Sequence, residues 1–87
     1  MPKFFIPVHM KQEFSGVSTV TADAATVGEL FDEVERTCPG MKARIWDQHQ
    51  LRTSLALVVD GNVSTLGRRQ TLKPDSEVHI VPAIGGG

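Results

Sequence analysis

One segment of this chain carries a strong helix signal, and the segments around it alternate as strands do. Thr26 and Glu29 stand three residues apart, as in a capping box, where each side chain accepts a hydrogen bond from a free backbone N–H. The apolar side chains that follow are Val27, Leu30, Phe31 and Val34. They repeat at helical spacing, and Pro39 and Gly40 end the segment. A single amphipathic helix cannot bury its apolar face alone, so we expect it to pack on a sheet.

The segments before the helix predict two strands that form a hairpin. In residues 3–10 the side chains alternate, and strand geometry sends them to opposite faces. The inward set is Phe4, Ile6, Val8 and Met10, and the outward set is Lys3, Phe5, Pro7 and His9. Residues 15–21 are small and β-branched, which favours a second strand.

The segments after the helix predict three more strands. Residues 41–52 read as an irregular loop anchored by Ile45 and Trp46. The strands are expected at residues 54–59, 63–66 and 77–82, with a tight turn at Asp60 and Gly61. The order strand, strand, helix, strand, short strand, strand predicts an α+β domain with one helix on one face of a mixed four- to five-stranded sheet. This is the β-grasp, or ubiquitin-like, arrangement. We expect residues 1–82 to form one domain and residues 83–87 to follow it as a glycine tail.

Composition excludes several classes of function. The formal net charge is −1 and the longest basic run is the pair Arg68 and Arg69, so nucleic acid is a poor candidate partner. One cysteine allows neither an internal disulfide nor a cysteine-based metal cluster. The sequence contains no 18-residue apolar run and no signal-peptide pattern, so we expect no membrane association and a cytoplasmic location.

Reactive side chains are few and scattered. His9, His49 and His79 fall on three separate segments, and no third ligand stands near the Asp47 and His49 pair, so no metal site is predicted. Cys38 continues the apolar face of the helix and has no cationic neighbour in sequence, which favours a packed core thiol over a reactive one. The pattern is not that of an enzyme.

The last residues are the most informative ones. They read Pro82, Ala83, Ile84, Gly85, Gly86 and Gly87. Six extended residues reach about 20 Å, and glycine passes through a narrow channel in almost any conformation. The carboxylate of a terminal glycine is also the least hindered acyl group that a protein can offer.

Four stretches carry a resemblance to a known family. They are residues 26–30, residues 38–40, residues 59–61 and, most specifically, residues 72–87. With these motifs the chain resembles the ubiquitin-like sulfur carriers MoaD, ThiS and CysO, and it is most similar to the CysO and MoaD branch. It departs from the family in having three terminal glycines, and in having Pro74, Asp75 and Ser76 in place of the usual Asp-Gly-Asp turn.

The resemblance implies a carrier rather than a catalyst. A ubiquitin-activating-type adenylyltransferase would use ATP and Mg²⁺ to adenylate the Gly87 carboxylate, and the carrier itself would bind no cofactor. The product would be a thiocarboxylate at Gly87, which a sulfur-accepting synthase would consume in a biosynthetic pathway. Partner enzymes would recognise the tail residues before Gly87, which are Ala83, Ile84, Gly85 and Gly86. A metalloprotease could trim the tail.

Three alternatives remain open at this point. The chain could be a protein modifier that forms isopeptide bonds from Gly87 to lysines, or the small subunit of molybdopterin synthase. It could also be a plain interaction module with an inert tail.

Strand alternation also predicts a docking face. If Phe4 and Ile6 face the helix, Phe5 and Pro7 point to the opposite side of the sheet. His79 and Val81 on the last strand, and Ala56 or Val58 on the middle strand, would join them there. One helix cannot cover this second face, so we expect partner proteins to bind on it.

Overall fold

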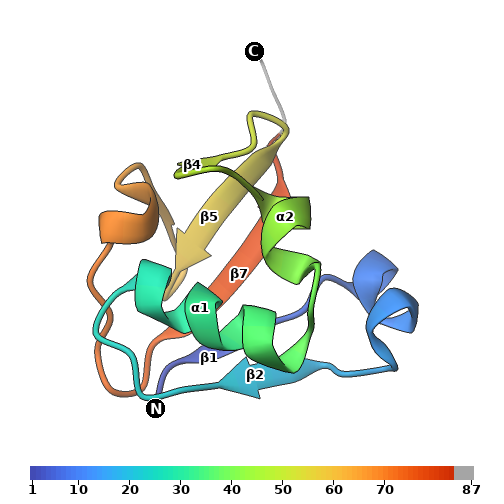
Figure 1. Cartoon of the computed structure of the whole chain (residues 1–87). Coiled ribbons are helices and arrows are strands. Elements are labelled where there is room, and N and C mark those ends of the chain that lie inside the picture. The colour runs from blue at the N-terminus through green and yellow to red at the C-terminus, as the bar shows by residue number, and fades with distance from the viewer. Residues whose placement is uncertain (84–87) are drawn as a thin grey trace.

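The computed structural model describes residues 1–83, in which helices lie on one face of a five-stranded mixed sheet (Figure 1). The sheet has the order β2-β1-β7-β5-β6. Its strands are β1 (Lys3–Phe5), β2 (Thr19–Thr21), β5 (Leu55–Val59), β6 (Asn62–Ser64) and β7 (Glu77–Pro82). β1 and β7 pair in parallel, and the other three neighbouring pairs are antiparallel. This topology confirms the α+β, β-grasp prediction.

The main helix, α1 (Val27–Thr37), begins at the predicted N-cap. Thr26 Oγ1 accepts a hydrogen bond from the Glu29 N–H at 3.3 Å. Glu29 Oε1 reaches back to the N–H of Ala25, one residue before the cap, at 2.9 Å. The helix ends before Gly40, whose φ of 96° lies in the left-handed region that glycine tolerates best. Among residues 1–83, no helix is long and apolar enough to cross a membrane.

The core lies between α1 and the sheet. The Phe31 ring on α1 meets the Phe4 ring on β1 with centroids 4.7 Å apart, and it meets Trp46 edge-on at 5.4 Å. All three side chains are buried. Cys38 is buried at the end of the same helix face, and this burial, with a smaller contribution from the Glu35 charge, raises the pKa of its thiol. Cys38 is therefore a packed core group, as the sequence predicts.

The two N-terminal strands are shorter than predicted. β1 ends at Phe5 rather than at Met10, and the chain turns into two 3₁₀ helices, η1 (Val8–Met10) and η2 (Gln12–Phe14). Pro7 has no N–H to continue the ladder, and its carbonyl instead accepts a turn hydrogen bond from the N–H of Met10. Val8 therefore points to solvent, contrary to the expected alternation, whereas Met10 is buried. β2 likewise begins at Thr19 rather than at residue 15.

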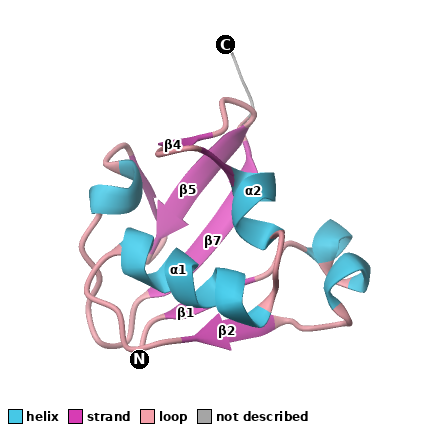
Figure 2. Ribbon diagram, viewed as in Figure 1, coloured by secondary structure: helices cyan, strands magenta, loops and turns pink. Residues whose placement is uncertain are grey.

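Residues 41–52 are ordered, contrary to the predicted irregular loop. They form a short helix, α2 (Met41–Ile45), and a hairpin of β3 (Trp46–Asp47) and β4 (Gln50–Leu51), shown in Figure 2. The Glu35 carboxylate accepts hydrogen bonds from the N–H groups of Gly40 and Lys42, and so holds the start of α2. Ile45 and Trp46 are buried, as predicted for anchors.

The turn between β5 and β6 also fixes the start of β7. Asp60 and Gly61 have φ values of 52° and 84°, which match the two left-handed positions of a tight hairpin. The Asp60 carboxylate accepts hydrogen bonds from the Glu77 N–H and from the Ser76 hydroxyl, both at 2.9 Å. These bonds, that of Glu77 first, hold the pKa of Asp60 below its usual value.

We expect Asp60→Asn to lower the free energy of unfolding by about 0.5–1 kcal/mol at neutral pH. The two hydrogen bonds reach different oxygens of the Asp60 carboxylate, and the amide of asparagine has only one oxygen to accept them. Asparagine tolerates the left-handed backbone, so the turn should persist. Since the folded-state pKa of Asp60 is lowered, its contribution is present above the unfolded pKa and is lost as pH falls through the folded one. Urea unfolding followed by circular dichroism should give Asp60→Asn a lower free energy of unfolding than the wild-type protein at neutral pH, and the difference should disappear in acid. A deficit of equal size at both pH values would contradict this account.

We expect Phe31→Ala to lower the free energy of unfolding by about 3–5 kcal/mol, because the truncation leaves a cavity at the centre of the core. Val63→Ala is the matched control, since Val63 is 69% exposed and should change stability by about 0.5 kcal/mol or less. Both values come from chemical denaturation. Equal stability of Phe31→Ala and the wild-type protein would show that α1 does not pack through this face.

Candidate functional site

The candidate site begins where β7 leaves the sheet. β7 pairs with β1 on one side and with β5 on the other, and the β5 ladder continues to the pair Leu55 and Pro82. One residue later, the N–H of Ala83 donates to the carbonyl of Ser54 at 2.9 Å. The chain is therefore held by backbone hydrogen bonds until Ala83, which is exposed. Ile84, Gly85, Gly86 and Gly87, which are predicted to carry the chemistry, lie outside the described residues.

Next to this point lies an open face of the sheet, which we define by Phe5, Val58, Val63, His79 and Val81. Phe5 pairs with His79 and His79 pairs with Val58, so the three side chains form one row across β1, β7 and β5. The Phe5 and His79 rings stack in parallel, with centroids 4.4 Å apart. Both helices, α1 and α2, lie on the other face of the sheet (Figure 2).

The structure brings together most of the residues predicted for the docking face. Phe5, Val58 and His79 are half-buried in the central row, and Val81 stands in the next row beside Ala56 with 38% of its surface exposed. Pro7 is half-buried but stands after the end of β1, outside the ladder. Sequence reasoning missed Val63, which pairs with Val58. The two-residue turn at Asp60 and Gly61 was the available signal, because it sets the register of this hairpin.

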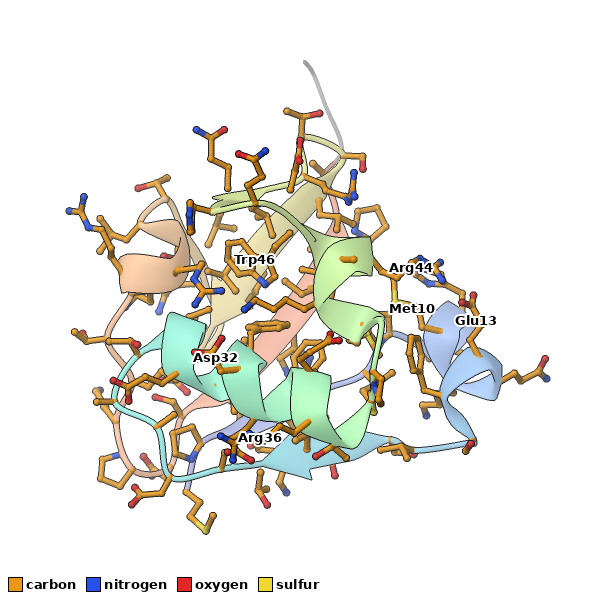
Figure 3. All side chains as sticks on the ribbon, viewed as in Figure 1. Met10, Glu13, Asp32, Arg36, Arg44 and Trp46 are labelled. Carbon is orange, nitrogen blue, oxygen red and sulfur yellow. The ribbon has the colours of Figure 1, made fainter. Side chains whose placement is uncertain are left out.

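The helix face carries a different, charged arrangement. The Asp32 carboxylate on α1 lies 2.8 Å from Lys42 Nζ and 3.4 Å from Arg68 Nη2. The hydrogen bond from Lys42, more than that from Arg68, holds the pKa of Asp32 below its usual value. These pairs join α1, where Figure 3 labels Asp32, to α2 and to η3 (Gly67–Arg69). Within residues 1–83, no three His, Cys, Asp or Glu side chains gather as metal ligands would.

Comparison with family models matches the ThiS family over residues 9–87, a span that reaches the terminal glycine. The chain belongs to the ThiS family. Members of this family are small protein carriers rather than catalysts. Comparison with curated protein sequences gives no match.

Solved structures give the same result for the fold. A chain in the crystal structure of the BexX/CysO complex from Amycolatopsis orientalis matches with a TM-score of 0.87 and 28% identity. The match covers 100% of the present chain and 100% of the matched one. CysO from Mycobacterium tuberculosis matches with a TM-score of 0.85 and 20% identity, over 97% of this chain and 100% of that one. Small archaeal modifier protein 1 from Haloferax volcanii matches at 0.73 with 23% identity, over 99% and 98%. These neighbours agree with the ubiquitin-like β-grasp fold described above.

Proposed function

We propose that this protein is a sulfur carrier whose Gly87 carboxylate is adenylated and then converted to a thiocarboxylate. The observation that supports this most is the ThiS-family match up to Gly87, combined with a sheet that holds the chain as far as Ala83. Gly87 is four residues from Ala83, which directly follows the central strand β7. A protein that holds the sheet thereby also sets the point from which the last residues extend.

The chemistry needs activation because a carboxylate is a poor electrophile with a poor leaving group. In the proposed cycle, a ubiquitin-activating-type adenylyltransferase supplies ATP and Mg²⁺, and the Gly87 carboxylate displaces pyrophosphate to form an acyl-adenylate. Sulfide then displaces AMP and leaves the thiocarboxylate directly. If the terminal sulfur of a persulfide displaces AMP instead, the product is an acyl disulfide, and a second thiol cleaves its S–S bond to release the thiocarboxylate together with a disulfide. The resulting sulfur is anionic and weakly solvated, which makes it a good nucleophile for an acceptor held by a separate synthase. All of these steps are proposed to take place in the cytoplasm, with no cofactor resident on the carrier.

Conjugation to proteins is a second candidate function. It is favoured by the match to small archaeal modifier protein 1 over nearly the full chain. A modifier would use the same activation, after which a lysine amine rather than sulfide would attack the Gly87 acyl group. Service as the small subunit of molybdopterin synthase would share the thiocarboxylate and differ only in the acceptor.

Intact mass after incubation with the adenylyltransferase, ATP and a sulfur source distinguishes these functions. Replacement of one oxygen by sulfur supports the carrier, and adducts on lysines support the modifier. An unchanged mass with an adenylyltransferase that is active on another carrier would leave only the inert interaction module.

We expect deletion of Gly86 and Gly87 to abolish adenylation and to leave the melting temperature nearly unchanged, because these residues add almost no apolar area to the core. Pyrophosphate exchange and thermal unfolding measure the two effects. One bulky residue added after Gly87 is the companion variant, and it should block activation unless a protease such as the proposed metalloprotease removes it. A truncated chain that still gains sulfur, or that unfolds, would refute the assignment of Gly87.

We further propose that the activating and accepting enzymes bind in turn on the open face. Val81→Glu should then weaken binding to the adenylyltransferase at least tenfold, about 1.4 kcal/mol, with little change in stability. Val8→Glu is the matched control, because Val8 is an exposed valine on η1, outside the sheet. Titration calorimetry gives both affinities. Equal binding by the two variants would eliminate the open face as a docking surface.

A further inference from the structure

A pocket of about 550 Å³ lies on the helix side of the molecule, between the β3–β4 hairpin and the segment that joins β6 to η3. Its lining residues are His49, Gln50, Leu51, Ser64, Thr65, Leu66, Gly67, Arg68 and Arg69. It shares no residue with the open face. The volume lies within the range of about 300–1,000 Å³ that is typical of ligand pockets.

The wall formed by residues 64–70 is held in place by several contacts. The Arg68 guanidinium packs so closely on Gly28 of α1 that a Cβ there would lie 3.2 Å from it. The Ser64 hydroxyl donates a hydrogen bond to Gln70 Oε1 at 2.6 Å and accepts one from the N–H of Leu66. The N–H of Val27 donates to the carbonyl of Gln70 at 2.9 Å, which ties the segment to the start of α1. A partner would therefore meet a preformed wall and lose little entropy in ordering it.

The pocket is locally basic on a chain whose net charge is −1. No carboxylate lines it, and the exposed Arg69 side chain makes no ion pair or hydrogen bond within residues 1–83. Leu51 and Leu66 supply apolar surface beside the arginines, and Leu66 is 52% exposed. Guanidinium groups bind carboxylates through two parallel hydrogen bonds. The complementary ligand is thus a carboxylate next to an apolar side chain.

The pocket is also near Ala83, the last residue that the structure describes. Ser54, whose carbonyl holds Ala83, follows Leu51 by three residues, so their Cα atoms are at most ~10 Å apart. A standard interface buries about 800 Å² on each partner, a patch about 30 Å across. One protein that receives the tail can therefore cover the pocket as well.

We infer that this pocket docks the adenylyltransferase, and that an acidic side chain of that enzyme, flanked by an apolar one, pairs with Arg69 and packs on Leu66. The inference rests on the proposed function, because it names the enzyme that activates Gly87. With the open face on the other side of the sheet, this contact fixes the direction in which the tail enters the enzyme. Such positioning matters because a reacting group is effective only when it is held in the right geometry.

The test compares Arg69→Glu with Arg36→Glu, which makes the same charge change. Arg36, labelled on α1 in Figure 3, stands in an exposed pair with Glu33 and does not line the pocket. We expect Arg69→Glu to weaken binding to the adenylyltransferase at least tenfold and Arg36→Glu to change it less than twofold. The affinity of Arg69→Lys for the adenylyltransferase should lie between those of the wild-type protein and Arg69→Glu, because lysine keeps the charge and loses the bidentate hydrogen bonding. Circular dichroism confirms that each variant is folded.

Binding and sulfur loading are measured separately, so the two proposals fail in different ways. A wild-type protein that binds but is not adenylated refutes the proposed function, while the comparison of arginine variants still decides the pocket. Equal affinity of Arg69→Glu and the wild-type protein overturns the inference, and so does an absence of binding by the wild-type protein.

A free small anion is the rival occupant. It is tested by titrating the isolated chain with inorganic phosphate and with N-acetyl-leucyl-glutamate, an apolar residue followed by a carboxylate. Trp46 is the only tryptophan, and its ring lies 3.8 Å from the Cβ position of Gly67 in the pocket wall, so its fluorescence reports occupancy. Phosphate binding that Arg69→Glu abolishes, with unchanged enzyme affinity, would assign the pocket to a small anion and overturn the docking inference.

Discussion

Strand β7 hydrogen-bonds to β1 on one side and to β5 on the other. Both the core and the open face of the sheet depend on this double pairing. The inward side chains of β7, Val78 and Ile80, belong to the core, and the outward ones, His79 and Val81, belong to the open face. The carbonyl of Ser54 then holds Ala83 immediately after the strand. One strand therefore couples the stability of the domain to the position of Ala83, the residue that precedes the last four.

The elements that could be predicted from sequence are those with a local cause. The cap at Thr26 and the turn at Asp60 and Gly61 depend on residues within three positions of each other, and both are present in the structure. The 41–52 segment differs from the predicted irregular loop because its helix and hairpin depend on contacts that have no periodic pattern in the sequence. Glu35 of the preceding helix holds the start of α2, and Ile45 and Trp46 at the end of α2 are buried in the core. Three buried side chains, Met41, Ile45 and Trp46, give too weak a signal in so short a segment to define a helix or a hairpin.

The candidate site shows the same division. The row of Phe5, Val58 and His79 follows from strand alternation, because the two-residue period sends alternate side chains to one face. Pro7 lies outside this row, contrary to the alternation, because β1 ends at Phe5 and proline has no N–H to continue the ladder. The basic pocket could not be predicted, since its two walls come from segments that are separated in sequence and meet only in the fold. In the sequence Arg68 and Arg69 are an isolated basic pair, whereas in the fold residues of the β3–β4 hairpin line the same pocket.

The burial of Cys38 has a consequence for any chain that carries sulfur. It is the single cysteine of the sequence, and it is enclosed by the core at the end of α1. A loaded carrier would thus present one accessible nucleophilic sulfur, the one at Gly87, and would have no surface thiol with which that sulfur could form an internal acyl or disulfide link. Side reactions with an internal thiol, which would discharge the carrier on itself, are removed by the packing of this one side chain. Alkylating reagents would, for the same reason, distinguish loaded from unloaded molecules without any substitution in the domain.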